Sequence, residues 1–312
     1  MLPVSLPAVA ECQKLFPALA TLTGTSLPLC APKAIVSRFH PEKGIQPVQI
    51  HPHFDNPARS GDCVMVAGWH TATANPRTYV DWLIGLKEKT PVDTAWYAPA
   101  SALPSTAAIL CYSGFDLFDY TAVDLKSAQG RFCTPEGDFP KDALTDGICT
   151  CPGCAAGDLR EHNRHALRQE IALVTRFIGQ GEVRDLVESR CRLDAAQVAI
   201  LRHIDRHYEF MERVQPIARP GVMRANSGES LQRAEVRRFA ERVIGRYVPP
   251  KTDVAVLLPC SAKKPYSLSQ SHRKFQQAVG ARAHELNVTT PLGLVPRKHE
   301  SAYPAGHYDV PV

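Results

Sequence analysis

Four side chains of the metal-ligand type fall within fourteen residues of the chain: Cys149, Cys151, Cys154 and His162. The three cysteines stand so close together that they cannot spread over a sheet or a helix face, so the segment must curl around one centre. A Pro-Gly pair before the third cysteine favours such a turn. Three thiolates and one imidazole form a soft tetrahedral set that suits Zn²⁺ and leaves no position for water. The spacing therefore predicts a structural zinc site.

His165, three residues further on, is an alternative fourth ligand. The other cysteines are scattered singly, and the N-terminus lacks the basic segment of a signal peptide. We therefore expect metal ligation and reduced thiols rather than a disulfide framework.

No apolar run approaches the length of about 18 residues that a membrane span needs. We expect no membrane span and a cytoplasmic protein.

The 312 residues are enough for two domains, each with its own core. Residues 62–69 read as a buried strand, 76–87 as an amphipathic helix and 94–98 as a short strand, and 107–112 are another apolar run. Alternation of strands and helices predicts an α/β layer with a parallel sheet.

The second half of the chain is mainly helical by its pattern and ends in a shorter mixed segment. The expected helices are 159–179, 193–214, 229–246 and 271–286, and the expected core strand is 254–258. The domain boundaries we predict are 1–190, 191–250 and 251–312.

Arginine is concentrated in the helical part. Between Arg160 and Arg246 there are seventeen arginines, twelve acids and no lysine, so this segment carries a net charge of +5. Arginine without lysine suits bidentate contacts to phosphate or carboxylate. Because the acids alternate with the arginines, a salt-bridged helical surface is the alternative interpretation.

Residues 113–120 read SGFDLFDY and follow the apolar run 107–112. Asp116 and Asp119 would then lie at the C-terminal end of a strand, the edge where α/β folds build active sites. One of these carboxylates is a candidate nucleophile or base. A cap of a helix or turn is the alternative.

A third cluster follows the expected strand 254–258. Cys260 stands beside Lys263 and Lys264, and Tyr266 and His272 come shortly after. Neighbouring cations favour the thiolate form of a cysteine, which is the nucleophilic form. Proline at 259 and 265 prevents a regular helix, so we expect a loop that displays these groups.

The first two motifs resemble the C-terminal end of the barrel of tRNA-guanine transglycosylases. The resemblance implies that Asp119 is the glycosyl nucleophile. It also implies that Cys149, Cys151, Cys154 and His162 bind the structural zinc.

The third motif resembles the signature of the archaeosine synthase family, a paralogue of the transglycosylases. The signature PCxxxKPYxxSxxH is matched at Pro259, Cys260, Lys264, Pro265, Tyr266, Ser269 and His272. The resemblance covers roughly residues 62–312 and includes the segments 291–297 and 303–309.

The archaeosine synthase resemblance implies that an amine such as lysine adds across the nitrile of 7-cyano-7-deazaguanine in tRNA and forms an amidine. Cys260, Lys264, Tyr266, Ser269 and His272 are then the expected catalytic residues, together with Asp119. We expect Cys260 to attack the nitrile, Tyr266 or His272 to move protons, and Lys264 to activate the thiol or hold phosphate. A radical-SAM protein is an implied partner.

Two departures from these families matter. Only about 120 residues precede Asp119, which is too few for the βα units of a full barrel. The expected fold is therefore α/β: a shortened TIM-barrel-like transglycosylase domain with a zinc site and a helical extension, and then a smaller α/β domain. The chain also ends at Val312, without room for the RNA-binding domain usual in archaeosine synthases. Open strand edges favour a homo-oligomer.

Two other functions stay open from the sequence. The first is a transglycosylase that exchanges guanine in tRNA, or less expectedly in DNA. The second is a non-catalytic zinc-containing subunit that binds nucleic acid.

Overall fold

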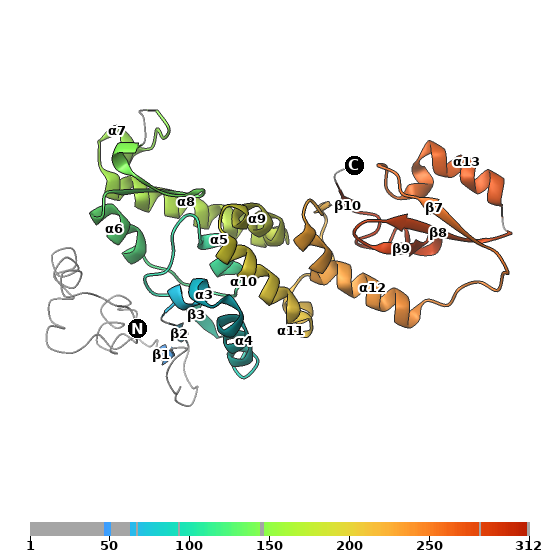
Figure 1. Ribbon diagram of the computed structural model, residues 1–312, viewed down its shortest axis with the longest axis horizontal. Coiled ribbons are helices and arrows are strands. Elements are labelled where there is room, and N and C mark those ends of the chain that lie inside the picture. The colour runs from blue at the N-terminus through green and yellow to red at the C-terminus, as the bar shows by residue number, and fades with distance from the viewer. Residues whose placement is uncertain are drawn as a thin grey trace. The chain divides into compact units, whose positions relative to one another are not determined.

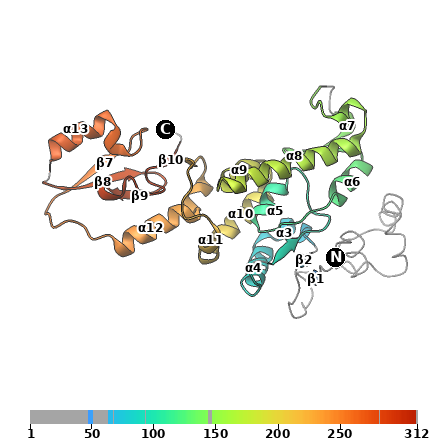
Figure 2. The same cartoon turned by 180° about the vertical axis from the view of Figure 1, so that it is seen from behind.

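A computed structural model describes most of the chain after residue 46, and the earlier part of the predicted first domain lies outside the described residues. The described ranges are 47–50, 63–66, 68–92, 94–143, 147–280 and 282–310. The chain divides into two compact units (Figures 1 and 2). The first contains the described residues up to Arg176 and Ser189–His203, and the second contains Phe177–Glu188 and the chain from Ile204 onward.

A parallel three-stranded sheet forms the centre of the first unit. Its strands lie in the order β1 (Pro47–Ile50), β2 (Cys63–Val66) and β3 (Ala95–Tyr97). The chain crosses from β2 to β3 through α3 (His70–Ala74) and α4 (Pro76–Lys87). The predicted strand–helix–strand unit is confirmed.

Helix α4 begins and ends where its sequence predicts. The Asn75 side chain accepts a hydrogen bond from the Thr78 amide, and proline occupies the first helical position. One face of α4 is buried, and Lys87 at its end places its ammonium 3.7 Å from the centre of the Trp96 ring on β3. This cation–π contact joins the end of the helix to the sheet.

The apolar run 107–112 is helix α5 (Ala107–Tyr112), so the strand that we expected before Asp116 is wrong. The first four residues of α5 are fully buried. A short run that is buried on all sides has no period that separates strand from helix. The chain nevertheless reaches the sheet just after α5, because Leu117 forms a parallel bridge with Tyr97 of β3.

The rest of the first unit surrounds the cysteine cluster. An antiparallel hairpin precedes the cluster in the chain. The elements are α6 (Thr121–Ala128), β4 (Arg131–Thr134), β5 (Gly137–Pro140), the short helix η2 (Lys141–Ala143), α7 (Pro152–Ala155) and α8 (Leu159–Gly179). Helix α8 matches its predicted bounds.

The predicted helix 193–214 is interrupted. At His207 the backbone angles are φ −87° and ψ 53°, which breaks the helical hydrogen bonding. The segment forms η3 (Cys191–Leu193), α10 (Ala195–Arg206) and α11 (Tyr208–Val214), and the preceding helix α9 (Val183–Arg190) was not predicted.

The C-terminal part of the second unit is a small α/β fold. Strands β7 and β8 are parallel, β8 and β9 are antiparallel, and β10 pairs with β6. The elements are β6 (Met223–Arg224), η4 (Gly228–Gln232), α12 (Ala234–Arg246), β7 (Ala255–Pro259), η5 (Tyr266–Leu268), α13 (Gln270–Val279), β8 (His284–Thr289), β9 (Gly293–Pro296), η6 (Arg297–His299) and β10 (Tyr308–Asp309).

The predicted helix 271–286 is wrong beyond Val279. Helix α13 ends at Val279, and the next residue, Gly280, has a φ of 57° in the left-handed region that favours glycine. The chain then enters β8, where Asn287 and Thr289 are buried on one face. On the other face Val288 and its cross-strand neighbour Leu294 remain about half exposed.

Many arginines of the helical region are bound to carboxylates of the same chain, as the salt-bridge interpretation predicted. In the second unit the pairs are buried rather than on the surface: Arg233 is 0% exposed and donates to both Asp185 and Glu188. The further members of this network are Arg184, Asp205 and Arg219. Removing one member of such a network leaves an uncompensated buried charge, so these arginines are held for structure.

No helix in the described part of the chain is both long enough and apolar enough to cross a bilayer.

Candidate functional site

The four predicted metal ligands lie together in the first unit. The ligand atoms of Cys149, Cys151, Cys154 and His162 all lie within 4.8 Å of one another. The Nδ1 atom of His162 is 3.4 Å from Sγ of Cys151 and 3.2 Å from Sγ of Cys154. Burial lowers the pKa of His162, which keeps the imidazole neutral, as a ligand must be. The donor set can therefore bind a metal ion.

The turn and the hairpin hold these ligands in place. Gly153 has no room for a side chain, because a Cβ would lie 2.3 Å from the His162 amide nitrogen. The Nε2 atom of His162 lies 3.1 Å from the Cys133 carbonyl oxygen, and Phe132 stacks on the imidazole at 3.7 Å between ring centres. Asn163 accepts a hydrogen bond from the Cys133 amide. Such contacts orient a ligating histidine, and His165 is not part of the cluster.

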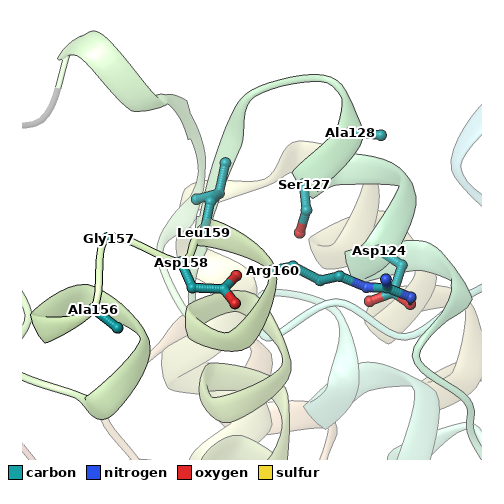
Figure 3. Close-up of a pocket in the computed structure, with 8 residues that line it drawn as sticks. All are labelled: Asp124, Ser127, Ala128, Ala156, Gly157, Asp158, Leu159 and Arg160. Carbon is teal, nitrogen blue, oxygen red and sulfur yellow. The ribbon is translucent and has the colours of Figure 1, made fainter. Parts of the chain in front are cut away.

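A pocket of about 490 Å³ lies between α6 and the start of α8 (Figure 3). Burial by itself would raise the pKa of Asp124, but hydrogen bonds from Arg164 and Arg160 outweigh it and lower the pKa below its usual value. Figure 3 shows the Arg160 side chain reaching the Asp124 carboxylate. The ion pairs of Asp124 with Arg160 and Arg164 thus join α6 to α8, and these charged groups are already bound to each other.

Asp119 lies at the edge of the sheet and both of its oxygens are engaged. Its Oδ2 accepts from the Tyr97 hydroxyl at 2.6 Å and from the Ala100 amide at 3.0 Å, and its Oδ1 accepts from the Thr121 amide at 2.7 Å. Asp116 is tied to the same strand, since it accepts from the Trp96 amide. The catalytic role of Asp119 stays a prediction.

The third cluster forms a loop at the C-terminal end of β7 in the second unit. Cys260 is exposed there. The Lys264 ammonium lies 4.2 Å from the centre of the Tyr308 ring and interacts electrostatically with Cys260. Burial lowers the pKa of Lys264, although the charges of Asp309 and Cys260 oppose this. The loop thus presents an exposed thiol and, four residues further on, an amine that loses its proton more readily than usual.

Tyr266 and Ser269 lie beneath this loop. Tyr266 is 0% exposed, its hydroxyl is hydrogen-bonded to that of Tyr308, and burial raises its pKa, so the phenol is neutral. The Tyr308 hydroxyl is also bonded to Thr289. Ser269 caps α13 by accepting a hydrogen bond from the His272 amide. These residues fix the floor of the loop.

His272 is fully buried and both of its ring nitrogens are used. Nδ1 lies 3.0 Å from Arg297, which can only donate, so Nδ1 accepts. Nε2 lies 2.9 Å from the carbonyl oxygen of Pro259, so Nε2 carries the hydrogen and donates. Burial, followed by the charge of Arg297, lowers the pKa of His272. A neutral imidazole therefore holds the carbonyl that directly precedes Cys260.

Arg297 holds His272 and the motif loop in place. Its guanidinium binds Glu285 at 2.6 Å and Glu300 at 2.8 Å in addition to His272. Glu300 also accepts a hydrogen bond from the Ser267 amide in the motif loop.

We expect the Arg297→Gln variant to raise the pKa of His272. The charge that opposes an imidazolium is removed, while Glu285 and Glu300 remain beside the ring and favour it. In the wild type the pKa of His272 is below the ordinary 6.5, so the unfolded chain binds more protons and stability falls as the pH drops below about 6.5. An NMR titration of the His272 ring checks this: the variant should protonate at a higher pH than the wild type. Equal titration curves would contradict the assignment.

The predicted catalytic residues thus fall into two groups. Cys260, Lys264, Tyr266, Ser269 and His272 lie together in the loop after β7 and the start of α13, in the second unit, whereas Asp119 and the metal ligands belong to the first. The prediction that the loop displays all these groups is wrong, since Tyr266, Ser269 and His272 are buried. Sequence reasoning did not select Arg297, Glu300, Thr289 and Tyr308. Arg297 and Tyr308 could have been selected, because they lie in the segments 291–297 and 303–309 that resemble archaeosine synthases.

Comparison with known proteins agrees with these motifs. A family described as "Domain of unknown function (DUF5591)" matches residues 236–312, which include the whole motif loop. The chain is 42% identical over 272 residues to the archaeosine synthase subunit alpha of Methanosarcina acetivorans, and 41% identical over 240 residues to the archaeosine synthase of Haloferax volcanii. These matches cover 81% and 75% of the chain and 44% and 41% of the relatives.

More distant similarity extends to the transglycosylases. The tRNA-guanine(15) transglycosylase of Methanobrevibacter smithii is 27% identical over 231 residues, which cover 67% of the chain and 34% of that protein. The chain is thus similar to part of the transglycosylases and matches the DUF5591 family in its C-terminal residues. More narrowly, it is a homologue of the archaeosine synthases, as its motifs predicted, and it spans less than half the length of the two described above.

Proposed function

We propose that this chain belongs to a tRNA-modifying enzyme of the archaeosine synthase type, which adds an amine across the nitrile of 7-cyano-7-deazaguanine in tRNA. The observation that supports this most directly is the loop after β7, which exposes Cys260, contains Lys264 and rests on the buried, hydrogen-bonded His272. The names of the relatives point to the same pathway.

In the proposed reaction the Cys260 thiolate attacks the nitrile carbon, and a C–S bond replaces one C–N π bond. The nitrile nitrogen takes a proton and a thioimidate results. The amine then attacks the same carbon, the C–S bond breaks, and the sulfur leaves as thiolate while the amine loses a proton. This splits a difficult addition into two easier steps. We assign the first proton to Lys264, since the ring nitrogens of His272 are both occupied.

The function is tested with tRNA that carries the nitrile base. The protein is incubated with this tRNA and with lysine or another primary amine, and the nucleosides are analysed by mass spectrometry. We expect a product whose mass is the sum of nucleoside and amine, because no atom leaves in the addition. Unchanged nitrile nucleoside with every amine would contradict the proposal.

We also propose that the Cys3His cluster binds Zn²⁺ and that the parallel sheet is part of a shortened barrel. A soft tetrahedral donor set favours zinc over harder cations. The parallel bridge of Leu117 to β3 supports a further strand position next to the three strands.

A transglycosylase that uses Asp119 is the second candidate. The similarity to tRNA-guanine(15) transglycosylases favours it, whereas the engagement of both Asp119 oxygens disfavours a free nucleophile. We expect no incorporation of labelled guanine into tRNA by the wild-type protein. Incorporation that Asp119→Asn abolishes would overturn this expectation and establish base exchange.

Two further partners are proposed. Leu257 is 61% exposed and Leu294 50% exposed on the open face of the β7–β8–β9 sheet, which supports association with a second copy of the chain. A radical-SAM partner follows only from the resemblance, and a cytoplasmic location stays a prediction. A protein that binds tRNA without turnover, alone and with such a partner, would instead be the non-catalytic subunit.

A further inference from the structure

A second pocket of the second unit lies away from Cys260. It has a volume of about 330 Å³ and runs along one face of α12. Tyr247 lines the pocket, and its hydroxyl is hydrogen-bonded to the His284 imidazole. His284 is the cross-strand partner of Ala255, the first residue of β7. Cys260 follows the other end of that five-residue strand, so strand geometry places the two regions about 15 Å apart. The proposed reaction does not use this pocket.

A buried carboxylate, that of Glu235, lines the pocket. Glu235 is 4% exposed, and no hydrogen bond or ion pair to its carboxylate is found among the described residues. It stands in the first turn of α12, where the helix dipole favours a negative charge. Buried polar groups are normally hydrogen-bonded, so this carboxylate has acceptor positions available for donors of a ligand.

Cations line the same face of α12 further along. Arg242 is about half exposed, and among the described residues its guanidinium has a single long ion-pair contact, of 3.4 Å, with Glu212. Arg246 is exposed and has no ion pair within the described ranges. Seven residues separate Glu235 from Arg242, which is about 10 Å along a helix. Phe239 and Tyr303 supply aromatic surface in the pocket.

This arrangement selects for a ligand with N–H donors at one end, a flat apolar body and an anion at the other end. Guanine presents two adjacent donors, N1–H and the 2-amino group, that one carboxylate can accept together. Adenine presents an acceptor at N1, which a carboxylate repels. A phosphate would reach the guanidinium groups, which bind it in a bidentate manner.

We propose that this pocket binds a guanine nucleotide, with Glu235 reading the base edge and Arg242 and Arg246 binding the phosphate. Burial raises the pKa of Tyr303 to about 12, so its phenol stays neutral and does not repel the anion. The nucleotide is either free or part of an RNA strand, and the same contacts serve both.

The proposal is tested by calorimetric titration of the full chain with GMP, AMP and guanosine. We expect GMP to bind more tightly than the other two. Glu235→Gln replaces one acceptor oxygen with an amide donor. The variant should lower the affinity for GMP about tenfold or more and leave the affinity for AMP unchanged. Arg242→Gln together with Arg246→Gln should bring the affinity for GMP down to that for guanosine. Arg273→Gln, an exposed arginine on α13 that does not line the pocket, is the control and should change nothing.

Single-stranded RNA separates the two sources. If a guanine-containing oligonucleotide binds more tightly than GMP, and its inosine counterpart does not, the pocket takes a base of an RNA strand. If the oligonucleotide binds no better than GMP, the ligand is the free nucleotide. Equal affinity for GMP and AMP, or no binding of GMP and oligonucleotide at millimolar concentration, overturns the proposal. Cys260→Ala should keep GMP binding, so failure of the proposed amine addition leaves this result intact.

Discussion

Replacing Cys260 with alanine is expected to lower the rate of amine addition by about three orders of magnitude or more, because the covalent route through the thioimidate is lost. The folded state should tolerate the change, since Cys260 is exposed and the support of the loop comes from His272 and Arg297. The measurement is single-turnover conversion of the nitrile nucleoside, followed by mass spectrometry. A denatured-protein mass spectrum of the wild type before the amine is added should show the covalent adduct with the substrate.

Cys111→Ala is the matched control for this experiment. Cys111 is half-buried in the first unit, and burial raises the pKa of its thiol to about 12, so it does not supply a thiolate near neutral pH. This control should react at the wild-type rate. A Cys260→Ala variant that also reacts at that rate would exclude the covalent route and move attention to direct attack by the amine.

The predictability of the two sites differs because their ligands are spaced differently along the chain. The metal set lies within fourteen residues, so a turn alone brings its atoms together and the sequence names all four. Support of the catalytic loop depends on Arg297, which lies twenty-five residues after His272. That contact exists only because β9 pairs with β8 and returns the chain to the loop. A sequence pattern does not show which distant segments pair in a sheet, so the contact of Arg297 with His272 could not be predicted.

The same distinction explains the secondary structure. Helix α4 carries a cap, a proline and a one-sided apolar pattern, and its predicted bounds are those observed. Helix α5 has none of these signals and is buried on all sides, so it was taken for a strand. The arginines were ambiguous for a related reason. Whether Arg233 meets a phosphate or the carboxylates of Asp185 and Glu188 depends on the packing of α9 against η4 and α12 rather than on its neighbours in sequence.

The Cys151→Ser variant, or removal of the metal by a chelator, is expected to destabilise the first unit by about 4 kcal/mol or more, which corresponds to a fall in Tm of roughly 10 °C. The cluster joins α7 and α8 to the hairpin through His162, and without the metal its three thiols and the buried imidazole have no common ligand. Elemental analysis should find about one zinc per wild-type chain, fixed by the four ligands, and much less in the variant.

His165→Ala is the control for the metal site, because His165 lies three residues from His162 and outside the cluster. This variant should keep its zinc and its Tm. The outcome that would contradict the site is a Cys151→Ser protein with full zinc content and unchanged Tm, or a loss of zinc from His165→Ala. Because amine addition is assigned to the loop of the second unit, the zinc-depleted protein should lose activity only in proportion to the fraction that unfolds. A complete loss of activity in fully folded, zinc-free protein would instead make the metal part of the reaction.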